Sequence, residues 1–233
     1  MLSIITIIKD DIIGFKSTFN SLLVQKNSNF EHVIIDASSS NEVSIFLSAC
    51  SPQFNVRYIN SDDKGIYDAL NRGIEKVNFQ FVLCLNSGDM LNNETSISRI
   101  LKYIKPKSYD AYFFNWSNLQ NKKFSFSSSP LRFNHQAVIY NRDLHKKHGD
   151  YVNLQTFTTA DYFFFIQVVL FSKYVNIDDE ISTIDSSGIS SGLQTLSQVY
   201  SINYLVGRTS RISLILVLIL HPIYLKVKKL LGL

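Results

Sequence analysis

Apolar and polar positions alternate along the first hundred residues as a regular series of strand-like and helix-like segments. Short apolar runs typical of buried strands alternate with longer stretches in which apolar residues recur every three or four positions, as on one face of a helix. The pattern predicts strands at 2–8, 31–36, 55–60 and 79–85, and helices at 12–25, 41–49, 65–77 and 94–104. This order is typical of βαβ units, so the sequence predicts an α/β fold whose parallel sheet is covered by helices on both faces.

The pattern changes after the fourth predicted helix. Shorter extended pieces predict an antiparallel or mixed extension of the sheet at 109–116, 122–127 and 136–140. A change of composition near residue 190 is the one boundary that the chain suggests. We therefore expect one domain over residues 1–190 and a C-terminal tail over residues 191–233.

The composition is that of a globular protein, because 45% of the residues are hydrophobic and 18% are charged. The two cysteines, Cys50 and Cys84, lie far apart, and Cys84 sits inside an apolar run. Buried, reduced thiols in a cytosolic protein are therefore expected rather than a disulfide. The N-terminus has no basic leader before its apolar run, which predicts a first strand rather than a signal peptide.

The net charge of +4 belongs to the tail. The first 185 residues carry 18 basic and 19 acidic side chains, and no acidic residue follows Asp185. Five basic residues do follow it: Arg208, Arg211, Lys226, Lys228 and Lys229. These few basic residues are not interleaved with aromatic ones, which argues against a nucleic-acid partner.

Between these charges lies an apolar run at residues 212–225, which His221 and Pro222 interrupt. The run is shorter than the ~20 apolar residues of a membrane-spanning helix. An apolar helix flanked by Arg and Lys suits the interface of an anionic membrane, so we expect the tail to lie on the membrane surface. The alternative is a tail that packs on its own domain or on a second subunit of a homo-oligomer.

A glycine-punctuated, charged block follows the third predicted strand. Residues 64–74 read Lys-Gly-Ile-Tyr-Asp-Ala-Leu-Asn-Arg-Gly-Ile, and residues 86–89, after the fourth predicted strand, read Asn-Ser-Gly-Asp. The pairs His135-Gln136, expected on a strand, and Asp161-Tyr162 come later. In this order the motifs resemble glycosyltransferase family 2 over roughly residues 2–190, and within it the small bacterial enzymes that build colanic-acid, capsule and O-antigen polysaccharides.

The resemblance implies a GT-A fold, a Rossmann-like three-layer α/β structure with a mixed, mostly parallel sheet, followed here by an apolar and basic helical tail. It implies an inverting glycosyltransferase of the hexosyltransferase type, which moves a sugar from a nucleotide-diphosphate donor, a UDP-sugar, to a lipid-linked saccharide acceptor. The expected location is cytoplasmic, peripheral on the inner membrane. A divalent cation, Mg²⁺ or Mn²⁺, would stabilise the charge of the departing diphosphate.

The resemblance also assigns roles to residues of this chain. Asp161, at the start of a predicted apolar helix, is the expected general base, and His135 is a second catalytic candidate. Asp89 is the expected metal ligand, the only carboxylate in a turn that carries Asp-x-Asp in most of the family. The expected donor contacts are Asp36, Asp63, Lys64, Tyr67, Asp68, Asn71 and Asn86.

Each assignment has a structural alternative. Asp36, Asp89 and Asp161 each precede or begin a predicted helix, where an aspartate is a common N-cap, and His135 could be a buried, hydrogen-bonded histidine. Two other functions stay open. The loss of acidic residues at Asn86 and Gly88 suits a catalytically silent nucleotide-sugar-binding subunit, and a sugar nucleotidyltransferase could use the same sheet but lacks a glycine-rich phosphate loop near the N-terminus.

Overall fold

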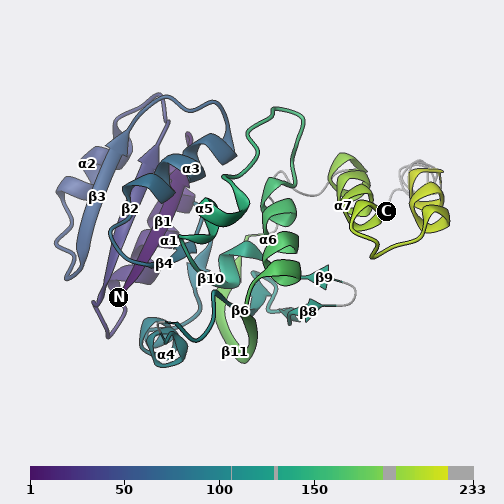
Figure 1. The fold of residues 1–233 in the computed structure, drawn as a ribbon. Helices are drawn as coiled ribbons and strands as arrows, with labels where there is room; N and C mark the ends of the chain where they lie inside the picture. The colour runs from purple at the N-terminus through teal and green to yellow at the C-terminus, as the bar shows by residue number, and fades with distance from the viewer. Residues whose placement is uncertain (106, 129–130, 186–192, 220–233) are drawn as a thin grey trace.

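The computed structural model describes residues 1–105, 107–128, 131–185 and 193–219 (Figure 1). Its strands are β1 (Leu2–Ile8), β2 (Phe30–Asp36), β3 (Asn55–Asn60), β4 (Phe81–Cys84), β5 (Met90–Leu91), β6 (Ala111–Asn118), β7 (Lys123–Phe124), β8 (Ser127–Ser128), β9 (Leu131–Arg132), β10 (Val138–Asn141) and β11 (Tyr174–Ile184). Its helices are α1 (Ile12–Leu23), α2 (Glu42–Ser48), α3 (Ile66–Lys76), α4 (Ser96–Tyr103), the 3₁₀ turn η1 (His135–Ala137), α5 (Leu144–His148), α6 (Ala160–Phe171) and α7 (Leu193–Leu205).

The main sheet has the strand order β3-β2-β1-β4-β10-β6-β11-β5, and β7 pairs in addition with the end of β6 at Trp116 and Ser117. Strands β3, β2, β1 and β4 are parallel, so their carboxyl ends lie along one edge. Strand β10 runs antiparallel to both β4 and β6, whereas β11 is parallel to β6. The α/β class and the mixed, mostly parallel sheet expected from the sequence are confirmed.

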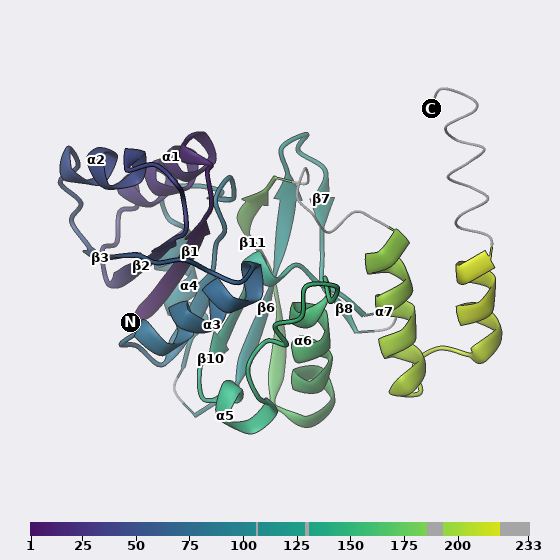
Figure 2. The same ribbon diagram turned by 90° about the horizontal axis from the view of Figure 1, so that it is seen from above.

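Helices cover both faces of this sheet (Figure 2). Successive residues of a strand point to opposite faces, so Ile5 packs under α3 and α6 whereas its neighbour Ile4 packs under α1. One apolar layer lies between the sheet and helices α3, α5 and α6. The other lies between the sheet and helices α1, α2 and α4. These two layers give the three-layer architecture expected from the resemblance.

Helix α3 lies unusually close to the sheet at Gly73. A Cβ atom at this position would come within 2.5 Å of the Ile5 side chain, so a glycine is required for this close approach. At the other end of the helix, Gly65 has a φ of +121°, a conformation that other residues rarely adopt. The two glycines therefore fix the depth and the entry direction of the helix that carries Tyr67.

Strand β11 and helix α5 were not predicted from the sequence. The middle of β11 carries Asp178, Asp179 and Glu180, and its pairing with β6 is irregular between Asn176 and Glu180. A charged, irregular strand lacks the alternation by which strands are predicted. Both cysteines are free thiols, as expected, and Cys84 is buried as predicted, whereas Cys50 is only half-buried.

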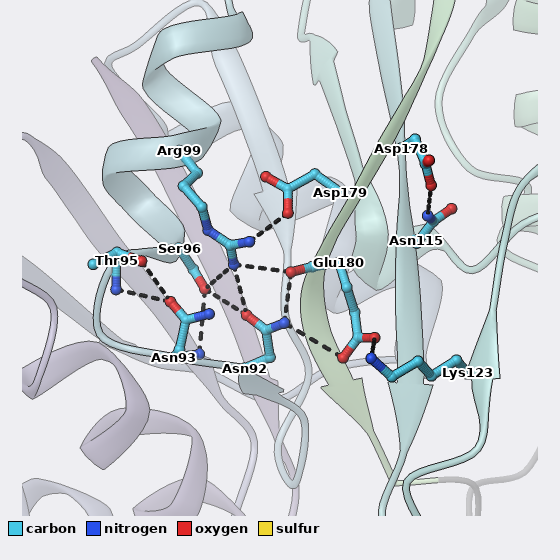
Figure 3. A network of polar contacts seen from close by, with 10 residues as sticks. All are labelled: Asn92, Asn93, Thr95, Ser96, Arg99, Asn115, Lys123, Asp178, Asp179 and Glu180. Carbon is cyan, nitrogen blue, oxygen red and sulfur yellow. Dashed lines mark hydrogen bonds and ion pairs between the residues drawn. The ribbon is translucent and has the colours of Figure 1, made fainter.

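A polar network joins the start of α4 to β11 (Figure 3). The Arg99 guanidinium forms an ion pair with Asp179 and donates to the Glu180 carbonyl oxygen at 2.9 Å and to Asn92 Oδ1 at 3.0 Å. The Asn92 backbone amide donates to the Ile181 carbonyl oxygen at 3.0 Å. Contacts from Arg99 and Asn92 thus hold the irregular part of β11 in one register, which fixes the position of the residues that follow this strand.

Helix α7 packs on α6 and leads to a second helical segment at residues 211–219. Figure 2 shows both helices beside the main body, on the side away from β3. No helix in the described part of the chain is long and apolar enough to cross a bilayer. The expected boundary near residue 190, and part of the apolar run at 212–225, lie outside the described residues.

A buried carboxylate joins two strands of the sheet to a connecting segment. Glu31 in β2 is 1% exposed. Its side-chain oxygens accept hydrogen bonds from Ser3 Oγ at 2.6 Å, from the Asn78 backbone amide at 2.5 Å and from Asn78 Nδ2 at 2.6 Å. Glu31 therefore ties β1 and β2 to the connection between α3 and β4.

We expect Glu31→Ala to lower the free energy of unfolding by about 2 kcal/mol, because the buried Ser3 hydroxyl and two partly buried Asn78 donors lose their acceptor. Urea unfolding measures this change. Glu75→Ala, at an exposed position of α3, is the matched control and should change stability by less than about 0.5 kcal/mol. Equal stability of the two variants would contradict a stabilising role for the Glu31 carboxylate.

Candidate functional site

The antiparallel strand β10 brings His135 to the end of β4. Tyr140 pairs with Val82 and Asn141 with Phe81, so residues that precede β10 lie beyond the carboxyl end of β4. The expectation that His135 and Gln136 lie on a strand is wrong. They form the turn η1, because the Asn134 side chain accepts the Gln136 backbone N–H at 3.0 Å and so stabilises a turn instead of an extended strand.

His135 joins the end of β4 to the start of α6. Its Nδ1 atom lies 2.9 Å from Asp161 Oδ2, and its Nε2 atom lies 3.4 Å from Asn86 Nδ2. The Tyr67 hydroxyl, from α3, lies 2.8 Å from Asp161 Oδ1. Residues expected at the site from four separate segments are therefore brought together. The side chains of His135 and Asp161 remain 15% and 22% exposed, so both are accessible from solvent.

Asp161 is held in its ionised form. Burial raises the pKa of its carboxyl group, but the hydrogen bond and positive charge of His135, with the hydroxyl of Tyr67, outweigh this effect and lower the pKa below its usual value. Asp161 also lies in the first turn of α6, where the helix dipole favours a negative charge. The N-cap of α6 is Thr159, so the alternative that Asp161 is this cap is wrong.

The turn at residues 86–89 is held by α1. The Thr18 hydroxyl donates to the Asn86 carbonyl oxygen at 3.1 Å and accepts the Gly88 N–H at 3.0 Å. The Ser87 hydroxyl donates to Asp11 Oδ2 at 2.8 Å. Neither Thr18 nor Asp11 was predicted from the sequence, because their role depends on how α1 packs against the end of β4.

Asp89 is 3% exposed at the end of this turn. Its carboxylate accepts the Asp185 backbone N–H at 2.9 Å and a hydrogen bond from the Gln136 side chain. Burial nevertheless raises the pKa of Asp89 to about 6. The N-cap of α4 is Thr95, so Asp89 is not a helix cap. Asp185, which follows β11, was not predicted at this site.

Two residues that are hydrogen-bonded to Asp89, Asn86 through its backbone and Gln136 through its side chain, carry oxygens of the kind that a hard divalent cation binds. Oδ1 of Asn86 and Oε1 of Gln136 are buried and lack a hydrogen-bond partner. Such orphaned oxygens, together with a carboxylate, are the ligands that Mg²⁺ and Mn²⁺ prefer. No group of three His, Cys, Asp or Glu side chains in the described residues could hold a metal by itself. A cation at Asp89 would therefore use amide oxygens, water or phosphate as well.

Asp36 has no exposed surface. Its carboxylate accepts the Ser38 N–H at 2.9 Å and the Tyr58 hydroxyl at 2.8 Å. It does not cap α2, whose N-cap is Asn41. Contact between Asp36 and a nucleotide stays a prediction, and in this conformation Tyr58 occupies one side of the carboxylate. Tyr58 was not predicted from the sequence.

The remaining α3 candidates make contacts within the protein. The Asn71 side chain donates from Nδ2 to the Tyr151 carbonyl oxygen at 2.8 Å and accepts the Tyr151 backbone N–H at Oδ1 at 3.0 Å. Asp68 forms an ion pair with Arg72 at 3.0 Å and accepts the Lys64 backbone N–H at 3.1 Å. Asn71 therefore shares with Tyr67 the helix face that packs toward Tyr151, whereas Asp68 is turned away from it.

A cavity of about 540 Å³ opens beside the start of α3. Lys9, Asp63 and Lys64 line one side of it, and residues 153–155 line the other. Lys9 Nζ lies 3.6 Å from Asp63 Oδ1. Two of the expected donor contacts, Asp63 and Lys64, are thus at a concave site at the carboxyl ends of β1 and β3, where ligands collect in open α/β sheets.

The sequence of the chain matches the family model "Glycosyl transferase family 2" over residues 3–175. The chain belongs to this family. An uncharacterized glycosyltransferase of Mycobacterium tuberculosis is 25% identical over 202 residues, which cover 81% of this chain and 76% of that protein. A PGL/p-HBAD biosynthesis glycosyltransferase of Mycobacterium bovis is 26% identical over 172 residues, covering 68% and 67% of the two chains.

Solved structures share the fold of this family 2 protein. S. aureus TarS in complex with UDP-GlcNAc superposes with a TM-score of 0.71 at 15% identity, covering 93% of this chain and 70% of that one. The mannosyltransferase PcManGT of Pyrobaculum calidifontis, in complex with GDP-Man and Mn²⁺, gives a TM-score of 0.68 at 11% identity, with 90% and 65% covered. At these identities the likeness concerns the fold, which agrees with the GT-A architecture expected from the sequence.

The raised pKa of Asp89 predicts how the stability of this family 2 protein depends on pH. The folded protein binds the Asp89 proton more tightly than the unfolded chain does. The resulting stabilisation is complete below about pH 4 and is lost as the pH rises through about 6. Asp89→Asn removes this titration. In EDTA, its free energy of unfolding should therefore gain about 3 kcal/mol relative to wild type between pH 4 and 8.

Urea unfolding at several pH values measures this difference. Asp62→Asn, at an exposed position, is the control and should differ from wild type by a nearly constant amount across the range. If Asp89→Asn also gave a constant difference, the Asp89 carboxyl group would titrate normally and its burial would carry no electrostatic penalty.

Proposed function

We propose that the chain is an inverting glycosyltransferase that moves a hexose from a UDP-sugar to a hydroxyl group of a lipid-linked saccharide. The observation that carries this proposal is the meeting of Asp161, His135 and the Asn86–Asp89 turn at one solvent-accessible place. Membership of the family supports sugar transfer. The likeness of fold to TarS in complex with UDP-GlcNAc supports a UDP-linked donor.

The donor would lie along the carboxyl ends of the parallel strands. In this proposal the nucleotide enters the cavity lined by Lys9, Asp63 and Lys64, whose two ammonium groups suit phosphate oxygens. Asn86 would contact the diphosphate or the sugar beside His135. Tyr67, Asp68 and Asn71 would support the site from α3 through their contacts with Asp161, residues 64–72 and Tyr151.

Asp161 is the proposed general base. An acceptor hydroxyl holds its proton too tightly to attack at neutral pH, so a base must accept that proton as the new glycosidic bond forms. Asp161 is ionised, and its oxygens keep lone pairs beyond those used by Tyr67 and His135. Attack from the face opposite the departing diphosphate, with one base and no covalent intermediate, inverts the anomeric configuration.

Asp89 is the proposed ligand of a divalent cation. When bound, Mg²⁺ or Mn²⁺ would offset the negative charge of the departing diphosphate. Asp89 would hold it with the orphaned oxygens of Asn86 and Gln136, and the Mn²⁺ bound to PcManGT, which shares the fold, supports a divalent cation as the cofactor. His135 would orient Asp161 through Nδ1 while its Nε2 atom faces Asn86.

The proposed place of action is the cytoplasmic face of the inner membrane. We take residues 1–190 as the transferase domain and 191–233 as a tail that binds the membrane surface, where a lipid-linked acceptor resides. Ile212, Ile215 and Ile219 are all exposed on the helical segment 211–219, and Arg208 and Arg211 precede them. A role in making cell-surface polysaccharide, of the capsule or O-antigen type, fits such an acceptor.

The catalytic proposal predicts that Asp161→Asn loses more than about 100-fold in turnover, since the amide cannot accept the acceptor proton. UDP release is measured with UDP-GlcNAc, UDP-glucose and UDP-galactose in the presence of Mn²⁺. UDP affinity, measured by calorimetry, should stay within about twofold because the substitution preserves shape. Asp143→Asn, at a half-exposed ion pair with Lys146, is the control and should keep wild-type turnover.

Full turnover by Asp161→Asn would remove Asp161 as the base. Absence of turnover in the wild type with every donor, together with tight UDP binding, would favour the silent nucleotide-sugar-binding subunit, the alternative that Asn86 and Gly88 suggest.

The membrane proposal predicts that replacing Ile212, Ile215 and Ile219 together with serine releases the protein from liposomes that contain anionic lipid. The substitutions remove three of the five large apolar side chains exposed on the described part of this segment, so we expect the bound fraction to fall at least about tenfold. Co-sedimentation measures it. Ile45→Ser, at an equally exposed isoleucine of α2, is the control. Unchanged sedimentation of the triple variant would rule out this helix as the anchor.

A further inference from the structure

The side chain of Gln198, on α7, forms hydrogen bonds with the segment that leads into α6. Its Oε1 atom accepts the Thr158 backbone N–H at 3.0 Å and lies 3.0 Å from the Thr159 hydroxyl and 3.3 Å from the Thr158 hydroxyl. Its Nε2 atom donates to the Thr156 carbonyl oxygen at 2.6 Å. One side chain therefore binds the backbone or hydroxyl groups of three residues just before the helix that carries Asp161.

The N-terminus of α6 lacks the usual side-chain cap. Thr159 occupies the N-cap position, but its hydroxyl accepts no hydrogen bond from the first turn of the helix and lies against Gln198 instead. The position of this helix end therefore depends on a contact from another helix. This contact comes from a residue distant in sequence, since Gln198 lies 39 positions after Thr159.

The same segment meets the carboxylate of Asp161 through Tyr67. The Tyr67 hydroxyl lies 2.9 Å from the Thr158 carbonyl oxygen and 2.8 Å from Asp161 Oδ1. A hydroxyl has one proton, so these two oxygens compete for it. A displacement of Thr158 changes how much of this hydrogen bond Asp161 receives. Gln198 holds the same residue through the Thr158 backbone N–H.

Helix α7 is itself docked on α6. Ile202 is 5% exposed within the apolar layer that contains α6. Asn203 Nδ2 donates to the Tyr162 hydroxyl at 2.7 Å. Gln198 lies one turn before these two residues, so the packing of α7 determines where its side chain meets the segment at 156–159.

We infer that Gln198 is a positioning residue for the general base, through which the docking of α7 controls the orientation of Asp161. The inference rests on the proposed role of Asp161 in sugar transfer. It makes α7, the start of the proposed tail, part of the catalytic apparatus although it contributes no group to the site. A change in how the tail is bound would then reach the base through Gln198, Thr158 and Tyr67.

The test compares Gln198→Ala with Gln194→Ala. Gln194 lies one turn earlier on α7 and donates only to the Thr156 carbonyl oxygen, so its removal perturbs α7 without freeing Thr158. Hydrogen exchange of the Thr158 amide should be about tenfold faster in Gln198→Ala, since its hydrogen bond to Gln198 Oε1 is lost. The Phe163 amide, which donates to the Thr159 carbonyl oxygen in the first turn of α6, should also exchange about tenfold faster. Exchange of both amides should be unchanged in Gln194→Ala. This measurement requires no substrate.

Turnover gives the second measurement, with the fastest donor among UDP-GlcNAc, UDP-glucose and UDP-galactose. We expect kcat of Gln198→Ala to fall about tenfold while KM for the donor stays within about twofold, because a small misplacement of the base affects the chemical step. The acidic limb of the kcat/KM profile should move to lower pH, since a displaced Thr158 carbonyl oxygen competes less for the Tyr67 proton and a stronger bond from Tyr67 lowers the pKa of Asp161. The titratable groups that act on Asp161 are His135 and Tyr67, with Cys84 and Tyr151 further away.

Gln198→Glu keeps the acceptor oxygen and should restore slow exchange at the Thr158 amide. It also provides a folded variant if Gln198→Ala unfolds. Wild-type exchange and an unmoved acidic limb in Gln198→Ala, or equal effects of the Gln194 and Gln198 substitutions, would overturn the inference. If Asp161→Asn is inactive while Gln198→Ala behaves as wild type, only the positioning role fails. If Asp161→Asn keeps full turnover, the proposed base fails instead.

Discussion

The contact between His135 and Asp161 is the interaction on which the candidate site depends. It joins η1, which precedes β10, to the first turn of α6, and it places the ring of His135 between Asp161 and Asn86. A carboxylate that is three-quarters covered by protein is stable only when hydrogen bonds and opposite charge compensate for the lost water. His135 and Tyr67 supply that compensation. Without them, Asp161 would hold a proton more tightly and would be less available as a base.

The antiparallel strand β10 makes this contact possible. In a wholly parallel sheet, the segment before the strand next to β4 would lie at the opposite edge from the end of β4. Because β10 runs the other way, η1 lies at the same edge as the Asn86–Asp89 turn. Strand β11 also ends there, since it is parallel to β6, and the backbone of Asp185 therefore reaches Asp89. The mixed sheet therefore brings the Asn86–Asp89 turn, His135 and Asp185 to the same edge, although they lie about fifty residues apart in sequence.

Local patterns were enough to predict the elements of the parallel half and the identity of several site residues. Strands β1, β2 and β3 are short apolar runs. Helix α3 follows a glycine N-cap, Gly65, and carries the charged block. The contacts of Thr18, Tyr58, Asp185 and Gln198 could not be predicted, because each depends on the register or packing of elements distant in sequence. Strand β11 was missed for a related reason. The middle of β11 is held by Arg99 in α4 and by Asn92 in the segment before α4. A strand is predicted from its own apolar residues, so contacts from another element give no signal in its sequence.

The environment of Asp89 contrasts with that of Asp161. Both carboxylates are largely buried, yet the pKa of Asp161 is lowered by a neighbouring histidine and a hydroxyl, whereas burial dominates at Asp89 and raises its pKa to about 6. The same site thus keeps one carboxylate charged through protein contacts and leaves the other with a charge that the protein compensates only in part. Buried oxygens of Asn86 and Gln136 beside it also lack donors. Such incomplete compensation lowers stability, and proteins retain it where a ligand completes the site. This difference is the physical reason for the proposed roles of Asp161 in proton transfer and of Asp89 in cation binding.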